Sequence, residues 1–122
     1  MTKKLHAIPN LPPPDPIETP DGLEAAGAGQ ALWAEVQRQY RIDDIGGYET
    51  LRQICCAVDM IARLRQRIDA DGAIIEGPNG MREHPGLKME LQYRSFVVRG
   101  LARLGLSIEP LRSGPGRPPG YA

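Results

Sequence analysis

Basic side chains are the residues of this sequence whose number and spacing indicate chemistry. The chain carries fifteen basic and fifteen acidic residues, so its net charge favours neither a nucleic acid nor a membrane as a partner. The distribution is uneven, because residues 85–122 contain six basic and only two acidic side chains, and a second basic cluster falls in residues 63–67. We interpret both clusters as candidate contacts to DNA phosphates, made by Arg63, Arg65, Arg67, Lys88, Arg94, Arg99, Arg103, Arg112 and Arg117.

A second interpretation of these cations stays open. Each could solvate a helix face or pair with an acidic residue such as Asp59, Asp69 or Asp71. Positive charge at residues 63–67 would also complement the dipole at the carboxyl end of a helix. None of the nine has the setting of a base-reading residue, so any DNA recognition is expected to use the backbone and the shape of the duplex.

Catalytic and metal-binding patterns are weak in this chain. It has no glycine-rich loop followed by Lys-Ser or Lys-Thr, which excludes ATP hydrolysis of the P-loop kind. Its two histidines, His6 and His84, are too few for a zinc site. His84 has no nucleophile or orienting group nearby in the sequence and is expected to satisfy a backbone group at a helix start. Cys55 and Cys56 are expected to pack as small apolar side chains. The sequence therefore predicts a protein that is not an enzyme and uses no cofactor or metal.

Length and composition predict one small domain with proline-rich ends. The 122 residues suffice for one core, and only 5% of them are aromatic. We expect a flexible arm at 1–20, a folded region at 21–112 and a flexible Gly/Pro tail at 113–122. No apolar run approaches the roughly 18 residues of a spanning helix, and no signal peptide is evident. Adjacent cysteines favour a reducing compartment, so we expect a cytoplasmic protein without a membrane partner.

Three segments have the apolar spacing of helices. The first is expected to begin at Asp21, which forms a capping-box pattern with Glu24, and to end at residue 40. The second is expected to begin near residue 43 or 44 and to stop at Asp71-Gly72, because glycine readily adopts the conformation that ends helices. This second helix would be about 40 Å long. A helix of that length in a small domain must pack along another long helix, in a nearly antiparallel or parallel arrangement.

The third helix supplies that partner. Residues 73–84 read as two short strands around a turn at Pro78 and Asn79. Pro85 suits the first turn of a helix that continues to Leu104 and stops at Gly105. The expected fold is mainly α: a long central helix packed antiparallel to a C-terminal helix, a small β-hairpin between them, the first helix across both, and disordered proline-rich ends.

Such a small core usually gains stability from association with other copies. We therefore expect a homo-oligomer, in which certain residues of the helical stripes lie either in the core or at a subunit interface. These residues are Trp33, Tyr40, Leu51, Val58, Leu91 and Val98.

The order of these elements and motifs resembles a known family. A helix with Leu32-Trp33, a long second helix, a hairpin, His84-Pro85 and a final helix closed by residues 104–106 follow one another between residues 20 and 112. This combination is similar to the small terminase subunits of tailed bacteriophages and prophages. The resemblance implies a non-enzymatic partner of the packaging motor. Such a protein assembles into a ring, engages concatemeric double-stranded viral DNA in the bacterial host, and delivers it to the large subunit, which holds the ATPase and nuclease.

Two other classes of protein remain as alternatives. One is a helical adaptor that binds other proteins of the packaging machinery and never touches DNA. The other is a small transcriptional regulator, but no short helix, tight turn and recognition helix with exposed polar readers can be placed in the sequence.

Overall fold

The computed structural model describes residue 12 and residues 15–106. These form α1 (Ala28–Tyr40), α2 (Ile45–Asp71), β1 (Ile74–Gly77), β2 (Gly80–Glu83) and α3 (Gly86–Arg103). The predicted fold class is confirmed, because the chain is mainly helical and a two-stranded antiparallel hairpin separates α2 from α3. Among the described residues, no helix is both long enough and apolar enough to span a bilayer.

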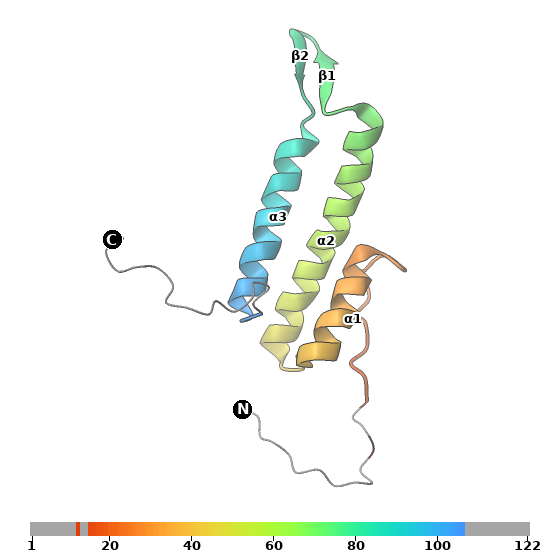
Figure 1. Ribbon diagram of the computed structural model, residues 1–122, viewed down its shortest axis with the longest axis vertical. Helices are drawn as coiled ribbons and strands as arrows, with labels where there is room; N and C mark the ends of the chain where they lie inside the picture. The colour runs from red at the N-terminus through yellow and green to blue at the C-terminus, as the bar shows by residue number, and fades with distance from the viewer. Residues whose placement is uncertain (1–11, 13–14, 107–122) are drawn as a thin grey trace, which may run out of the picture.

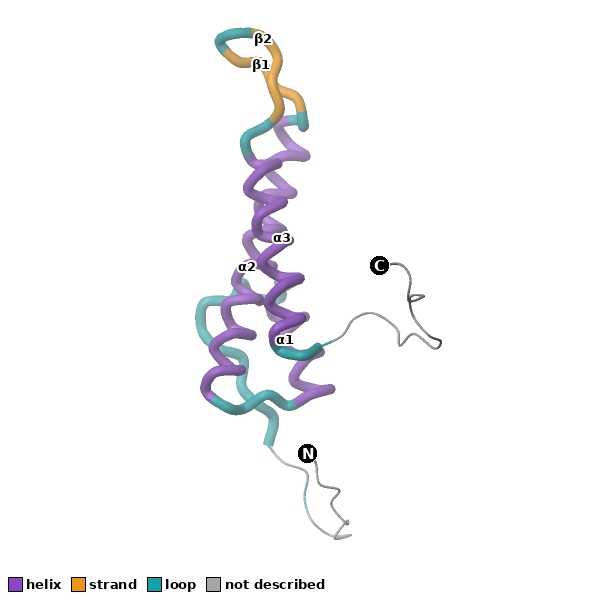
Figure 2. Tube along the Cα trace, turned by 90° about the vertical axis from the view of Figure 1, so that its left-hand side faces the viewer, coloured by secondary structure: helices purple, strands orange, loops and turns teal. Residues whose placement is uncertain are grey.

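The helices build a rod rather than a bundle (Figure 1). α2 and α3 run antiparallel along the length of the rod, and the hairpin continues beyond one end of the pair, as Figure 2 shows from the side. α1 lies beside the first half of α2 at the opposite end. It packs mainly on α2 and makes little contact with α3, which corrects the expectation that the first helix crosses both.

The two ends of α2 follow from local signals. Asp44 is its N-cap, and the carboxylate accepts the amide of Gly47 at 2.9 Å. The helix ends at Asp71, and Gly72 has a φ of 94° that a side chain would oppose. Both limits agree with those predicted from the sequence.

The start of α1 differs from the prediction. The helix begins at Ala28 rather than at Asp21, and its N-cap Gly27 has no side chain. The cap comes instead from Asp59 in the middle of α2, whose Oδ1 accepts the amide of Gly29 at 2.8 Å. Its Oδ2 accepts the amide of Glu24 at 2.9 Å. The predicted capping box was wrong because a carboxylate thirty positions away in the sequence occupies the place of a local cap.

Gly29 makes this arrangement possible. A Cβ atom at this position would lie 2.5 Å from the carbonyl oxygen of Cys55 and 2.8 Å from the Asp59 carboxylate. Such distances are far below van der Waals contact. The glycine therefore allows α1 to approach the backbone of α2 closely, which offsets its low helix propensity.

The main buried cluster lies at the α1 end of the rod. It contains Trp33, Val36, Leu51, Cys55 and Leu106, and the Trp33 ring meets the Tyr48 ring edge to face with centroids 4.9 Å apart. Trp33 and Leu51 are core residues, as one of the two predicted roles requires.

Three other residues of the predicted set do not lie in the core. Tyr40, Leu91 and Val98 are 47%, 66% and 59% exposed, and Val58 is half-buried. Leu91 and Val98 do not take the core role of the two that were predicted for them, because α3 turns Glu90 and Gly100 toward α2. A Cβ at Gly100 would lie 2.8 Å from Ile54, so the two helices meet closely there. For the exposed residues only the interface role remains, as a proposal.

Candidate nucleic-acid interface

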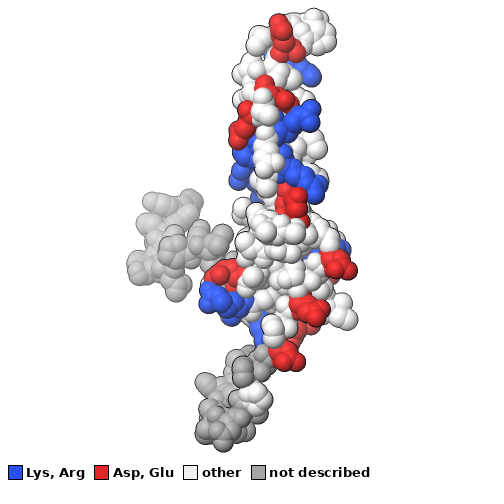
Figure 3. Space-filling model, turned by 90° about the vertical axis from the view of Figure 1, so that its right-hand side faces the viewer, with Lys and Arg blue, Asp and Glu red and all other residues white. Residues whose placement is uncertain are grey.

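Seven of the nine candidate cations lie on the α2–α3 rod. Arg63, Arg65 and Arg67 occupy the last third of α2, and Lys88, Arg94, Arg99 and Arg103 lie along α3. Arg112 and Arg117 fall outside the described residues. On the face drawn in Figure 3, Lys and Arg side chains alternate with Asp and Glu along the rod, so the pairing of each cation decides what it can bind.

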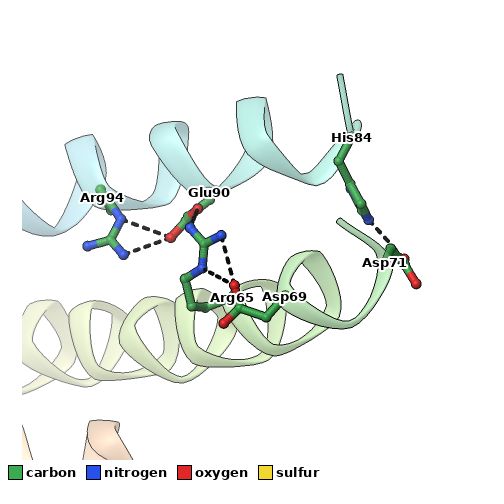
Figure 4. Close-up of polar contacts among 6 residues, drawn as sticks. All are labelled: Arg65, Asp69, Asp71, His84, Glu90 and Arg94. Atoms are coloured by element: carbon green, nitrogen blue, oxygen red, sulfur yellow. Dashed lines mark hydrogen bonds and ion pairs between the residues drawn. The ribbon is translucent and has the colours of Figure 1, made fainter. Parts of the chain in front are cut away.

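Arg65 and Arg94 are held by one buried carboxylate, Glu90. Arg65 Nη1 donates to Glu90 Oε1 at 2.9 Å, and Arg94 Nη2 donates to Oε2 at 2.7 Å (Figure 4). Arg65 also contacts Asp69 Oδ1 at 3.2 Å. Glu90 is only 5% exposed, and its bond with Arg65 ties α2 to α3 across their interface, whereas Arg94 pairs with it one turn away on α3 itself. Both guanidinium groups are thereby balanced within the chain.

Arg67 belongs to a second group at the hairpin end of the rod. Its Nε lies 2.8 Å from Asp71 Oδ2, and the same oxygen lies 2.9 Å from His84 Nε2. The other ring nitrogen of His84 accepts the amide of Gly86 at 2.9 Å, so Nε2 carries the proton and donates to Asp71. The prediction that this histidine satisfies a backbone group at a helix start is confirmed. The Asp71 carboxyl has a lowered pKa, first because of the His84 bond and then because of Arg67.

Three cations of α3 are not engaged in this way. Within residues 15–106, Lys88, Arg99 and Arg103 form no ion pair, and all three are exposed. Their spacings of eleven and four residues place them on one side of a helix with 3.6 residues per turn. That side points away from α2, because Glu90 and Gly100 face inward. We call these three residues the α3 basic row, which extends over about 22 Å at 1.5 Å per residue.

Arg63 is paired more weakly than Arg65, Arg67 and Arg94, but it is not unpaired like the α3 basic row. Its Nε lies 3.9 Å from Glu24 Oε1, and both side chains are about half exposed. An exposed contact of this length contributes little to stability. Arg63 is therefore free to exchange Glu24 for another anion.

Comparison with known proteins adds one finding. A family model described as "Phage terminase, small subunit" matches residues 31–110, which is more than half of the chain. The chain belongs to this family. The matched region contains most of α1 and all of α2, the hairpin and α3. No curated protein and no solved structure matches the chain.

In this member of the terminase small subunit family, the described residues hold no cluster of three metal-ligating side chains. Cys55 is buried with a free thiol, and burial raises its pKa to about 12, followed by the effect of Cys56. The thiol is therefore neutral at physiological pH and packs as a small apolar side chain, as predicted. Cys56 is half-buried and also unpaired.

Sequence reasoning missed two acidic residues that organise the small subunit. The spacing of Glu90 and Arg94 by four residues could have indicated their pairing on α3. No sequence signal connects Glu90 with Arg65, or Asp59 with Gly29, because these partners meet only after the helices pack. Arg82 of β2 was also not selected, although it is exposed and forms no ion pair with a described residue.

Acid should weaken the link between α2 and α3 through Glu90. Its pKa is lowered by the Arg94 hydrogen bonds first and by the charge of Arg65, against the effect of burial. A carboxyl whose pKa is lower in the folded state stabilises the fold above its unfolded pKa of about 4.3, and this contribution is lost as the pH falls through the folded pKa. We expect the urea midpoint of the wild type to fall between pH 5 and pH 3 more steeply than that of Glu90→Gln. Equal slopes for the two proteins would contradict this role of Glu90.

Proposed function

We propose that this chain is the DNA-engaging small subunit of a phage packaging terminase. In this role it is a non-catalytic homo-oligomer that binds concatemeric double-stranded viral DNA in the cytoplasm of the bacterial host. It delivers the DNA to the large subunit and regulates that ATPase and nuclease. Membership of the family supports a role in packaging. The observation that supports DNA contact is the α3 basic row, three exposed cations on one helix side without an ion pair among the described residues.

The row suits a sequence-independent contact with a polyanion. Long basic side chains on an exposed helix side reach phosphates, and each phosphate neutralised releases counterions. A row of three cations binds weakly by itself. Repetition of the row in every copy of a ring multiplies the contacts on one duplex, so the assembly gains avidity.

Ion pairing favours some of the candidate cations over others in this proposal. Arg65, Arg67 and Arg94 are engaged by Glu90 and Asp71, so the α3 basic row takes the leading role, with Arg63 as an auxiliary contact. The arm at 1–20 and the tail at 113–122, with Arg117, are proposed as tethers for DNA or the large subunit.

Neutralising the row tests the proposal. In the variant Lys88→Gln/Arg99→Gln/Arg103→Gln we expect the affinity for duplex DNA at 50 mM salt to fall roughly tenfold or more, with a smaller slope of log affinity against log salt. Electrophoretic shifts between 50 and 200 mM salt measure both quantities. The matched control, Arg38→Gln/Arg52→Gln/Arg67→Gln, removes the same charge from residues that pair with Glu35, Glu49 and Asp71. Equal affinity of the row variant and the wild type would refute the proposal.

A protein-binding adaptor without DNA contact is the second candidate. It is favoured by the zero net charge and by the ion pairs that engage Arg65, Arg67 and Arg94. Under this alternative the assembled wild type would not shift duplex DNA even at low salt, while still binding the large subunit.

A further inference from the structure

α3 exposes large apolar side chains on two opposite flanks. Leu91 and Val98 are 66% and 59% exposed, and Met89 and Phe96 are 46% and 41% exposed. The members of each pair are seven residues apart and therefore lie above one another, and the two pairs lie about 160° apart around the helix. The α3 basic row runs between them on the outward side. A helix that packs against one neighbour usually has a single apolar stripe on the side that faces it. Exposed apolar residues on both flanks therefore indicate further contacts.

The two flanks differ in shape. On the side of Met89 and Phe96, the seam between α2 and α3 is hollowed into a groove of about 500 Å³, which Cys56, Met60 and Tyr93 also line. The whole lining is uncharged. On the other side, the seam is filled by the bonds that Glu90 makes with Arg65 and Arg94, and Leu91 and Val98 stand exposed beside it. We call the first flank the groove and the second, Leu91 with Val98, the ridge.

We propose that the ridge of one copy seats in the groove of a second copy of this chain. This inference rests on the proposed function for its biological setting and specifies the surfaces through which copies gather. The copies lie side by side and parallel, with α2 behind α3 in each. If one copy were turned end over end in the same plane, groove would face groove and ridge would face ridge. Only the parallel arrangement pairs the two complementary surfaces.

Spacing and charge both favour a second copy as the occupant. The two ridge residues, Leu91 and Val98, are seven positions apart, and so are Met89 and Phe96 on the rim of the groove. The two pairs are offset from each other by two residues, or about 3 Å along the helix. The charges on both flanks are balanced within the chain, through Glu90 on the ridge side and through Asp71 with Arg67 on the groove side. Contact between the flanks therefore buries no unpaired charge, as the core of a stable interface requires.

The area indicates a closed set of copies rather than an isolated pair. α3 has 18 residues, so a contact along it covers a strip about 27 Å long and about 10 Å wide. This is well below the roughly 800 Å² per partner of a standard interface. When the ridge of each copy seats in the groove of the next and the last copy meets the first, every copy uses both flanks. The buried area per copy is then twice that of a copy in an isolated pair. In such a set, the basic rows of all copies lie on one surface and the α2 helices on the other.

Two complementary variants test this contact. Leu91→Glu/Val98→Glu removes the ridge, and Met89→Glu/Phe96→Glu removes the groove; neither pair belongs to the basic row. We expect each variant to be monomeric by size-exclusion chromatography with light scattering, whereas the wild type forms a larger closed species. At high protein concentration an equimolar mixture should form a weak one-to-one pair that grows no further, because one intact ridge and one intact groove remain and a single contact is small. Ala34→Glu/Gln66→Glu, at two exposed positions away from both flanks, is the matched control and should assemble as the wild type does.

Folding is checked by far-ultraviolet circular dichroism and thermal melting, which should change little for the ridge variant. If the groove variant does not fold, Met89→Glu alone replaces it, since Met89 is the more exposed of the two residues. A monomeric wild type, ridge variants of wild-type size, or a mixture without the pair would each overturn the proposal. Duplex binding is measured separately: a wild type that assembles through these flanks but never retains DNA would refute the proposed function and leave this contact standing.

Discussion

Replacement of Trp33 by alanine is expected to lower the free energy of unfolding by about 3–5 kcal/mol. The side chain is 1% exposed, packs against Tyr48 and fills the centre of the cluster that joins α1 to α2. Small domains are stable by only roughly 5–15 kcal/mol, so the variant should be partly unfolded at 37 °C. Urea titration followed by circular dichroism at 222 nm measures the change, because the substitution removes the sole tryptophan fluorophore.

Two controls separate packing from the loss of any aromatic ring. Tyr40→Ala removes a ring that is 47% exposed and should cost less than about 1 kcal/mol. Trp33→Phe should cost less than the alanine variant, because Trp33 Nε1 is buried without a hydrogen-bond partner in the described region and the phenyl ring retains much of the contact. Similar losses for Trp33→Ala and Tyr40→Ala would show that this cluster does not hold α1 in place.

The second large effect is expected from Asp59→Ala, at about 2–4 kcal/mol. This substitution leaves the amides of Glu24 and Gly29 without their acceptor, and the contact with Gly29 is buried. α1 would lose its N-terminal cap and its polar link to α2 at the same time. Chemical denaturation measures the total loss, and hydrogen exchange of the α1 amides locates it.

Asp21→Ala is the decisive comparison for Asp59. A local capping box at Asp21 would make this substitution costly, whereas the structure places Asp21 seven residues before the helix and exposed. We therefore expect Asp21→Ala to change the stability by less than about 0.5 kcal/mol. A larger loss for Asp21→Ala than for Asp59→Ala would contradict the observed start of α1.

Different sides of α3 have different roles. Its inner side carries Glu90 and Gly100, which hold it to α2. Its outward side carries the basic row, and its flanks carry the apolar groups proposed to join copies. The variants of the row and of the flanks therefore change different surfaces of one helix. Because of this separation, DNA retention can be removed without loss of assembly, whereas the loss of assembly is expected to weaken DNA retention through lost avidity.

The sequence by itself determined the elements whose signals are local. Asp44 caps α2 three residues away, Gly72 ends it, and His84 holds the start of α3 through an amide two residues on. Interactions over two to four positions depend only on backbone geometry, so they can be predicted before the chain is folded in space. The same reasoning identified the helical class and the hairpin, whereas the family was indicated by the resemblance of the order of motifs and shown by the family match.

The tertiary structure alone decided which charges are available and which apolar residues are buried. Arg65 meets Glu90 across twenty-five positions, and Asp59 caps α1 across thirty. Leu91 has the spacing of an inner residue, yet it is exposed because the close approach at Gly100 sets how α3 is rotated against α2. A repeat along one helix gives the relative directions of its side chains but not the direction of the neighbouring helix. Only the packing of two helices decides that direction. It therefore also decides which cations pair within the fold and which face outward.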